Sequence, residues 1–88
     1  MIDKMDNKAI EIAKKHIVGR LDMSYAGAYF DIFIVWKAKV LQNWKYLIRS
    51  TLVNGLYYEL TYNGDKNEWY LDCYMKIENH VIREGGTL

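Results

Sequence analysis

The chain has 88 residues, of which 51% are hydrophobic and 15% aromatic, so it is expected to fold as one domain with a small core and not to be disordered. Twelve lysines and arginines against eleven acidic residues give a formal net charge of +1. This balance argues against a general nucleic-acid binder and against an acidic mimic of nucleic acid.

The cysteine content and the first residues predict a cytoplasmic protein. Cys73 is the single cysteine, so no disulfide can cross-link the fold, which is typical of a reducing compartment. The first residues are charged and lack the apolar segment of a signal peptide. No apolar run approaches the roughly 18 residues of a membrane span, so we expect no membrane partner.

Residues 3–21 are predicted to form an amphipathic helix. Its apolar residues recur at three- and four-residue spacing and are Met5, Ala9, Ile10, Ala13, Ile17 and Leu21. Lysines occupy the other side, which favours a solvated face over a surface for nucleic acid or membrane. Asp3 is the expected N-cap, and Asp6 is expected to interact favourably with the positive end of the helix dipole.

From residue 29 onward the period changes to two, and turn signals divide the chain into predicted strands at 29–40, 44–52, 56–62 and 68–77. The even-numbered apolar residues of the first two strands are predicted to share the core face: Phe30, Ile32, Ile34, Trp36, Ala38, Val40, Trp44, Tyr46, Ile48 and Leu52. Three-residue loops at 41–43 and 53–55 and a four-residue loop at 63–66 then set the register. They predict pairing of Trp36 with Ile48, Ile48 with Leu60 and Leu60 with Trp69. They also place Arg49 opposite Glu59 on the outer face.

The last strand has an alternative interpretation. Tyr70, Tyr74, Ile77 and Val81 also fit a helical stripe, so periodicity alone leaves a helix open over residues 70–82. Residues 79–88 are expected to fray. The predicted fold is a single α+β domain over 1–88, an N-terminal helix packed on a four-stranded antiparallel meander in a cystatin-like arrangement.

The sheet face turned away from the helix is the first candidate functional surface. Tyrosine and arginine on an uncovered face are typical of protein interfaces, although tyrosines also occupy ordinary wet sheet faces. The residues expected to bind a partner protein are Phe33, Arg49, Tyr57, Glu59, Tyr70, Asp72 and Tyr74. The alternative is that this face forms a homodimer, which would bury the surface that is otherwise assigned to a partner protein.

The tip of the first hairpin is the second candidate surface. Lys37, Lys39 and Lys45 accompany aromatic residues there, a combination that can hold single-stranded nucleic acid by phosphate contact and stacking. The predicted register weakens this hypothesis, because it sends the aromatic rings to the core face and the lysines to the other.

Other reactive residues predict no catalytic, cofactor or metal site. Cys73 falls on the predicted core face and is expected to be a small buried hydrophobe. His16 and His80 lack the spacing of metal ligands. Glu59 and Asp72 are predicted to be diagonal neighbours near Arg49, which favours solvated ion pairing over acid-base chemistry. We therefore expect a non-enzymatic protein.

Two strings, LQNWK at residues 41–45 and YYELTYNGDK at 57–66, resemble a family of small proteins of unknown function from phages and prophages of Gram-positive bacteria. The resemblance covers roughly residues 30–82. The resemblance implies a protein that acts in the cytoplasm of the bacterial host. It would bind and inhibit a host protein, in particular a defence nuclease, in the manner of an anti-CRISPR inhibitor. The alternatives are a single-stranded nucleic-acid-binding protein of phage DNA or RNA metabolism and an oligomer that sequesters a nucleotide signal.

Overall fold

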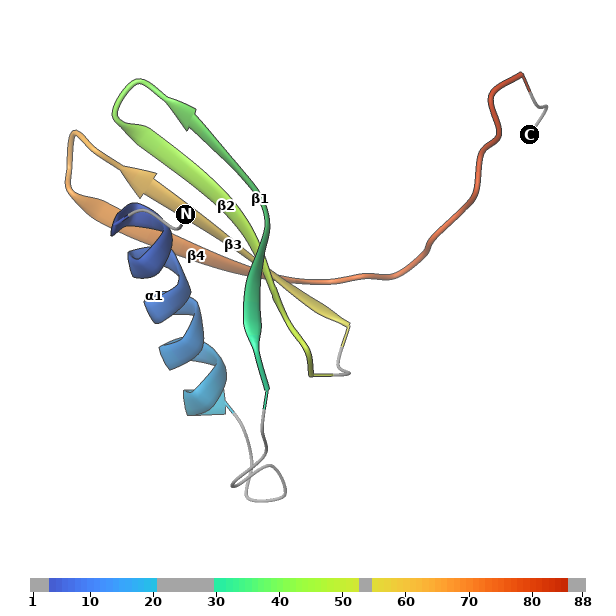
Figure 1. Ribbon diagram of the computed structural model, residues 1–88, viewed down its shortest axis with the longest axis horizontal. Helices are drawn as coiled ribbons and strands as arrows, with labels where there is room; N and C mark the ends of the chain where they lie inside the picture. The colour runs from blue at the N-terminus through green and yellow to red at the C-terminus, as the bar shows by residue number, and fades with distance from the viewer. Residues whose placement is uncertain (1–3, 21–29, 53–54, 86–88) are drawn as a thin grey trace.

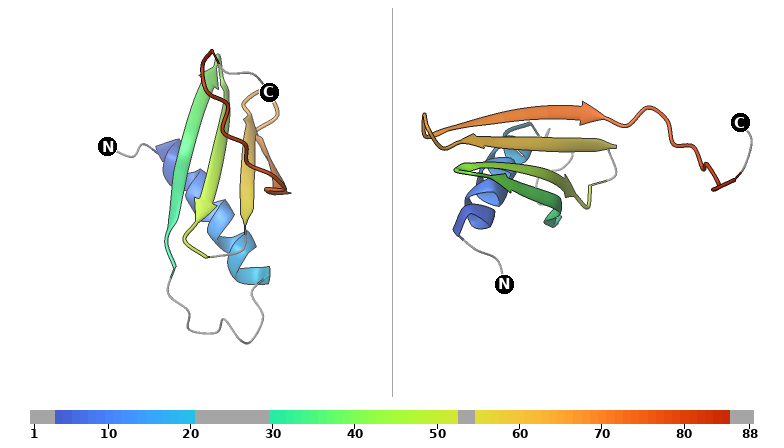
Figure 2. Two further views of the ribbon diagram at one scale, coloured as in Figure 1. Left: turned by 90° about the vertical axis from the view of Figure 1, so that its right-hand side faces the viewer. Right: turned by 90° about the horizontal axis from the view of Figure 1, so that it is seen from above.

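The computed structural model describes residues 4–20, 30–52 and 55–85. Its elements are α1 (Lys4–Arg20), β1 (Ile32–Val40), β2 (Asn43–Ser50), β3 (Leu56–Asn63) and β4 (Glu68–Met75). The strands form one antiparallel sheet in the order β1-β2-β3-β4, and α1 lies against one face of it (Figure 1, Figure 2). The predicted α+β fold, one N-terminal helix on a four-stranded meander, is confirmed.

The strand ends differ from the predicted ones by a few residues. The first strand begins at Ile32 and the second ends at Ser50, two residues earlier than predicted. The fourth strand ends at Met75 instead of residue 77, and residues 76–83 have no regular secondary structure, so the helical alternative for 70–82 is wrong. The predicted N-cap at Asp3 and the last apolar helix position, Leu21, lie outside the described residues.

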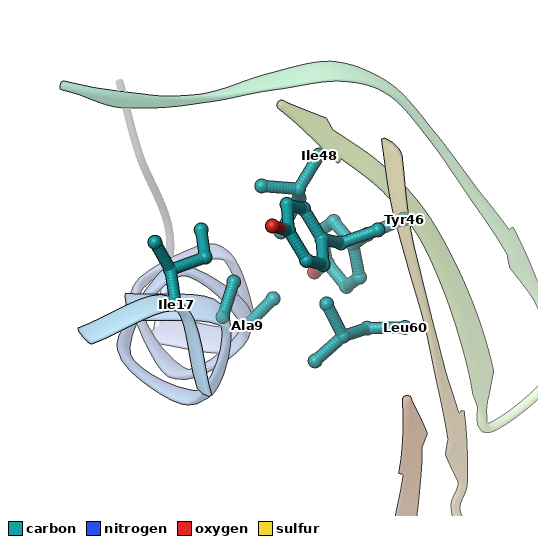
Figure 3. Packing of buried hydrophobic residues seen from close by; sticks show 7 residues of the cluster. Ala9, Ile17, Tyr46, Ile48 and Leu60 are labelled. Carbon is teal, nitrogen blue, oxygen red and sulfur yellow. The ribbon is translucent and has the colours of Figure 1, made fainter. Parts of the chain in front are cut away.

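The core lies between α1 and the middle of the sheet. The buried residues are Ala9, Ala13 and Ile17 from the helix and Tyr46, Ile48, Tyr58 and Leu60 from β2 and β3. Figure 3 shows the sheet side chains pointing at the helix face that carries Ala9 and Ile17. Alanine is a good helix former with a very small side chain, so the backbone of α1 can come close to the sheet at Ala9 and Ala13. The large ring of Tyr46 then fills the space between the helix and the sheet.

A buried carboxylate joins the start of α1 to two strands. Asp6 is 3% exposed, and its Oδ1 accepts a hydrogen bond of 2.9 Å from the hydroxyl of the fully buried Tyr46. Its Oδ2 lies 2.8 Å from the Nζ atom of Lys37 on β1. A buried charge is tolerated only when it is paired and hydrogen-bonded, so this cluster fixes where the first turn of the helix docks.

A bulge in β1 overturns the predicted register of the first hairpin. Ile34 pairs with Ile48, but Trp36 pairs with Leu47, which leaves Val35 as the extra residue. A shift of one residue exchanges the two faces. Beyond the bulge the outer-face residues are therefore Trp36, Ala38 and Val40, which had been predicted to lie in the core, and the helix-side residues are Lys37 and Lys39.

The first hairpin loop is shorter than predicted. It consists of Leu41 and Gln42 alone, because Val40 pairs with Asn43. The left-handed residue is Leu41, with φ of 56°, and not the predicted Asn43. Leucine is rarely found in this conformation, so its position carried no turn signal.

The other two pairings keep the predicted faces but are shifted by two residues. Ile48 pairs with Tyr58 instead of Leu60, and Leu60 pairs with Leu71 instead of Trp69. An even shift preserves the alternation, so the core face of β2, β3 and β4 is the predicted one. The connection between β2 and β3 spans residues 51–55, two residues more than the predicted three-residue loop, and this length accounts for its shift.

Hydrogen bonds join the tip of the β1–β2 hairpin to the tip of the β3–β4 hairpin, and this contact is called the lock below. The backbone N–H of Gly64 donates a 3.0 Å hydrogen bond to Oδ1 of Asn43, and the amide of Gln42 is bonded to the carboxylate of Asp65. A Cβ atom at position 64 would lie 2.3 Å from the carbonyl oxygen of Gln42. The two strings LQNWK and YYELTYNGDK, distant in sequence, thus meet at one end of the sheet.

Replacing the buried carboxylate should destabilise the fold. Asp6→Ala is expected to lower the free energy of unfolding by about 2–4 kcal/mol, because it removes the acceptor of the buried Tyr46 hydroxyl and the carboxylate that faces Lys37. Glu11→Ala, which removes the exposed partner of Lys15 on the same helix, should cost under about 0.5 kcal/mol. Urea unfolding followed by circular dichroism measures both. Equal losses in the two variants would contradict the assigned role of Asp6.

Adding one methyl group should have opposite effects at two glycines, Gly64 at a hairpin tip and Gly19 near the end of α1. Gly64→Ala is expected to destabilise by about 1–3 kcal/mol, because the new Cβ atom collides with backbone of the other hairpin. Gly19→Ala is the matched control, since no atom lies within 4 Å of a Cβ atom there and alanine favours the helix. Thermal unfolding should show a lower Tm for the first variant and an equal or higher Tm for the second. An unchanged Tm in Gly64→Ala would rule out the lock.

Candidate protein-binding surface

The outer face of the sheet is the face opposite α1. The register assigns to it Phe33, Trp36, Ala38 and Val40 of β1, Lys45, Leu47 and Arg49 of β2, Tyr57, Glu59 and Thr61 of β3, and Tyr70, Asp72 and Tyr74 of β4. Figure 2 shows the helix on the other side only, and no other helix or strand of the described residues covers this face. It crosses all four strands.

The seven residues predicted to bind a partner all lie on the outer face. Phe33 is opposite Arg49, Tyr57 is opposite Tyr74, and Glu59 is opposite Asp72. The exposed fractions of Phe33, Tyr70 and Tyr74 are 43%, 44% and 51%. Large rings that remain half exposed lose their remaining water contact only when another molecule covers them.

The charged groups of this face are arranged differently from the prediction. Arg49 does not pair with Glu59 but places its guanidinium carbon 4.5 Å from the centre of the Tyr57 ring, a cation-π contact. Glu59 instead lies 3.0 Å from the Nζ atom of Lys45. This exchange follows from the two-residue shift, because Leu47 and not Arg49 stands opposite Glu59.

Two carboxylates stand side by side at the centre of the face. Glu59 and Asp72 are directly opposite each other and not diagonal, as predicted. Like charges in this position repel, and the ammonium group of Lys45 next to Glu59 offsets that repulsion. The Arg49 guanidinium lies against the Tyr57 ring, and Asp72 presents an exposed carboxylate to which a basic group would be complementary.

Tyr70 is held in one orientation by its neighbour. Its hydroxyl donates a 2.6 Å hydrogen bond to Oε2 of Glu68, two residues earlier on the same side of β4. This bond, with a smaller contribution from burial, raises the pKa of the Tyr70 phenol above its usual value. The phenol therefore stays protonated at physiological pH, and the side chain remains 44% exposed.

The outer face carries a hollow that the sequence did not predict. Its volume is about 290 Å³, and the residues around it are Trp36, Ala38, Val40, Asn43, Trp44, Lys45 and Thr61. Trp36, 44% exposed, had been assigned to the core and so was missing from the predicted site. One signal could have found it: residues 32–36 are five consecutive apolar residues, which a strictly alternating strand with one solvated face does not have.

A second groove opens at the free edge of β1. Its volume is about 390 Å³, and it lies between the first turns of α1, at Asp6 and Ile10, and the strand segment from Ile32 to Lys37. The pair of Asp6 and Lys37 forms its polar side. This groove adjoins the outer face at Phe33 and Trp36, which line both surfaces.

The three lysines of the alternative nucleic-acid site do not share a face. Lys37 and Lys39 lie on the helix side, with their Nζ atoms 5.9 and 5.2 Å from the centre of the Trp44 ring. Lys45 lies on the outer face, where it pairs with Glu59. Trp44 itself stacks on Tyr46 at 5.9 Å.

Cys73 is exposed and not buried as predicted. It lies on the helix side, opposite Tyr58, but at the end of β4 that α1 does not reach. Within residues 4–20, 30–52 and 55–85, no three His, Cys, Asp or Glu side chains form a cluster able to hold a metal ion. The one helix of the described chain is too short and too polar to span a bilayer.

Comparison with known proteins identifies a family but no function. A search of curated proteins gave no match, and neither did a search of solved structures. The model of one protein family, described as a family of unknown function (DUF6275), matches residues 2–84. The match includes α1, all four strands and nearly all of the segment after β4. The chain therefore belongs to this family of unknown function, DUF6275.

Proposed function

We propose that the protein is a non-enzymatic binding protein that occupies a partner protein through the outer face of its sheet. One observation carries the proposal: half-exposed aromatic rings, an arginine and a hollow lie together on a face that no described element covers. Such a mixture of aromatic anchors and a few charged groups is the composition of interface centres.

The geometry supports anchoring at two points. The hollow beside Trp36 and Ala38 has room for one apolar side chain of the partner. On the neighbouring strand β4, Tyr70 stands opposite Thr61 at the border of the hollow, and Tyr74 lies farther along the strand, beyond Asp72. The Arg49 guanidinium, already in contact with the Tyr57 ring, needs little further ordering to bind a partner carboxylate.

The setting of this activity rests on the resemblance to small phage and prophage proteins. We propose a host defence protein as the partner, in the manner of an anti-CRISPR inhibitor that acts in the bacterial cytoplasm. The sheet face is suited to this use, because a rigid surface blocks a target by covering it and needs no catalytic residue. Binding to single-stranded nucleic acid is the less supported alternative, since the three lysines are divided between two faces and Lys45 is engaged by Glu59.

A photo-crosslinking residue should show which face meets the partner. The phenyl ketone p-benzoylphenylalanine is placed at Tyr70 in one variant and at Lys15, on the exposed side of α1, in another. In a nuclease-treated lysate of a Gram-positive host, the Tyr70 variant is expected to cross-link to one dominant protein, identified by mass spectrometry. The Lys15 variant should give none. Cross-links at Lys15 alone would refute the proposed surface, and loss of the adduct on nuclease treatment would favour the nucleic-acid alternative.

Binding to the identified protein should depend on Arg49. Arg49→Ala is expected to weaken the Kd by at least about tenfold, because truncating an interface arginine in contact with an aromatic ring typically costs more than 1 kcal/mol. Arg20→Ala, an exposed arginine at the end of α1, is the matched control and should bind as wild type. Isothermal titration calorimetry gives both values. In a host with active CRISPR immunity, wild type but not Arg49→Ala should restore phage plaques, and equal plaque counts would refute the anti-defence role.

A further inference from the structure

The segment after β4 leaves the sheet as an extended arm. The arm comprises residues 76–85 and projects away from the helix and the sheet (Figure 1, Figure 2). Its last backbone hydrogen bond to the sheet runs from the N–H of Lys76 to the carbonyl of Gly55, at 3.1 Å. Among the described residues, no backbone hydrogen bond joins residues 77–82 to another strand. Backbone N–H and C=O groups of the extended arm are therefore left without a strand partner, as they are at the edge of a sheet.

The apolar side chains of the arm continue the pattern of β4. On the helix side of the strand, the odd-numbered series ends with Met75, 67% exposed, and the arm extends it with Ile77 and Val81, at 88% and 76%. Ile82 adds a fourth apolar side chain, at 67%. Met75, Ile77 and Val81 share one parity, with Asn79 between them, which is compatible with an extended strand that lacks a neighbour.

We propose that the missing neighbour is the arm of a second copy, and that two arms pair antiparallel across a two-fold axis at Asn79. The axis would be normal to the sheet, since that is the symmetry of two identical antiparallel strands side by side. The same faces of both copies then coincide, so a residue can pair only with a residue of its own parity.

Three neighbouring registers satisfy this parity, and their side chains distinguish them. With Asn79 on the axis, Ile77 stands opposite Val81 of the second copy and Glu78 stands opposite His80, each pair occurring twice. With Glu78 on the axis, two glutamates face each other. With His80 on the axis, Ile77 faces Arg83. The first register alone joins apolar to apolar and acid to base.

Contacts within one arm are consistent with this register. The Nε2 atom of His80 lies 2.6 Å from Oε2 of Glu78, so both side chains already point to one side of the arm. In the dimer each imidazole would lie near the glutamates of both copies. Farther out, Met75 would face Arg83 and Tyr74 would face Glu84, so no like charges oppose each other.

The apolar area of the arm allows only a dimer of modest affinity. The four apolar side chains expose on the order of 500 Å² per copy, and edge-to-edge pairing covers only the part of each that faces the neighbouring strand, so backbone hydrogen bonds between the two arms supply the rest. The axis normal to the sheet places both outer faces on one side. The arm dimer therefore leaves the proposed binding surface free and makes it bivalent, but its existence does not depend on that function.

Cysteine cross-linking tests the axis position. In a Cys73→Ser background, Asn79→Cys should form an intermolecular disulfide on mild oxidation, because the two Cα atoms at the axis would be about 4.5–5.5 Å apart. Lys76→Cys is the matched control in the same arm, since its two copies would lie roughly 20 Å apart along the strands. Non-reducing electrophoresis should show at least tenfold more cross-linked dimer for Asn79→Cys. Equal cross-linking of the two variants would overturn the register.

Light scattering on the full chain tests the dimer itself. At about 100 μM the wild type should be dimeric, and the combined change Ile77→Asp with Val81→Asp should raise the dissociation constant at least about 100-fold. Its circular dichroism should stay that of wild type, because these side chains contact no core residue. A monomeric wild type, or a dimer that survives the double substitution, would refute pairing of the arms.

Discussion

The extra residue at Val35 is the constraint on which most of this structure depends. Before the bulge, Ile32 and Ile34 face the helix; after it, Lys37 and Lys39 do. The bulge thus brings the ammonium group of Lys37 to the buried carboxylate of Asp6, which also receives the hydroxyl of Tyr46. The same inversion turns Trp36 to the outer face, where it lines the hollow. One inserted residue therefore supplies both the polar anchor of the helix and an apolar element of the candidate surface.

The two faces of the sheet differ in how far they are covered. The helix side is filled by Tyr46, Ile48, Tyr58 and Leu60 against a stripe of alanines, and it closes the core with few side chains. The outer face keeps its rings half exposed and holds its charges by local contacts, such as Arg49 on the Tyr57 ring. Among the described residues α1 is the one helix and it lies against one face, so the opposite face stays uncovered by any described element.

The arm that follows β4 carries the two faces of the sheet beyond the part of the chain that packs on α1. The last paired residue of β4 is Met75, opposite the first residue of β3, but apolar residues of the same parity recur in the arm at Ile77 and Val81. Side chains that repeat at strand spacing without a neighbour are costly in water. Pairing of two such arms would cover part of that apolar surface, would satisfy the backbone groups at the strand edge and would leave the outer faces of both copies on one side.

Much of the fold could be predicted, because alternation and helical periodicity are local properties. The stripe through Ala9, Ala13 and Ile17 predicted the helix face that is buried, and parity alone predicted the faces of β2, β3 and β4. Parity also placed all seven candidate residues, from Phe33 to Tyr74, on one outer face. Register was less accessible, because it depends on loop length, and the loop over residues 51–55 is longer than its turn signal indicated.

By itself, then, the sequence determined the helix, the meander and the polarity of three strands, since each follows from spacing within a short window. Only the tertiary structure decided the side on which Trp36 and Lys37 lie, the partners of Arg49 and Glu59, and the exposure of Cys73. The physical reason is the same in each case. A bulge, a register shift and the reach of a helix are set by which distant groups pack together, such as Asp6 against Tyr46. A run such as residues 32–36 can mark an irregular strand, but it does not specify which groups will pair.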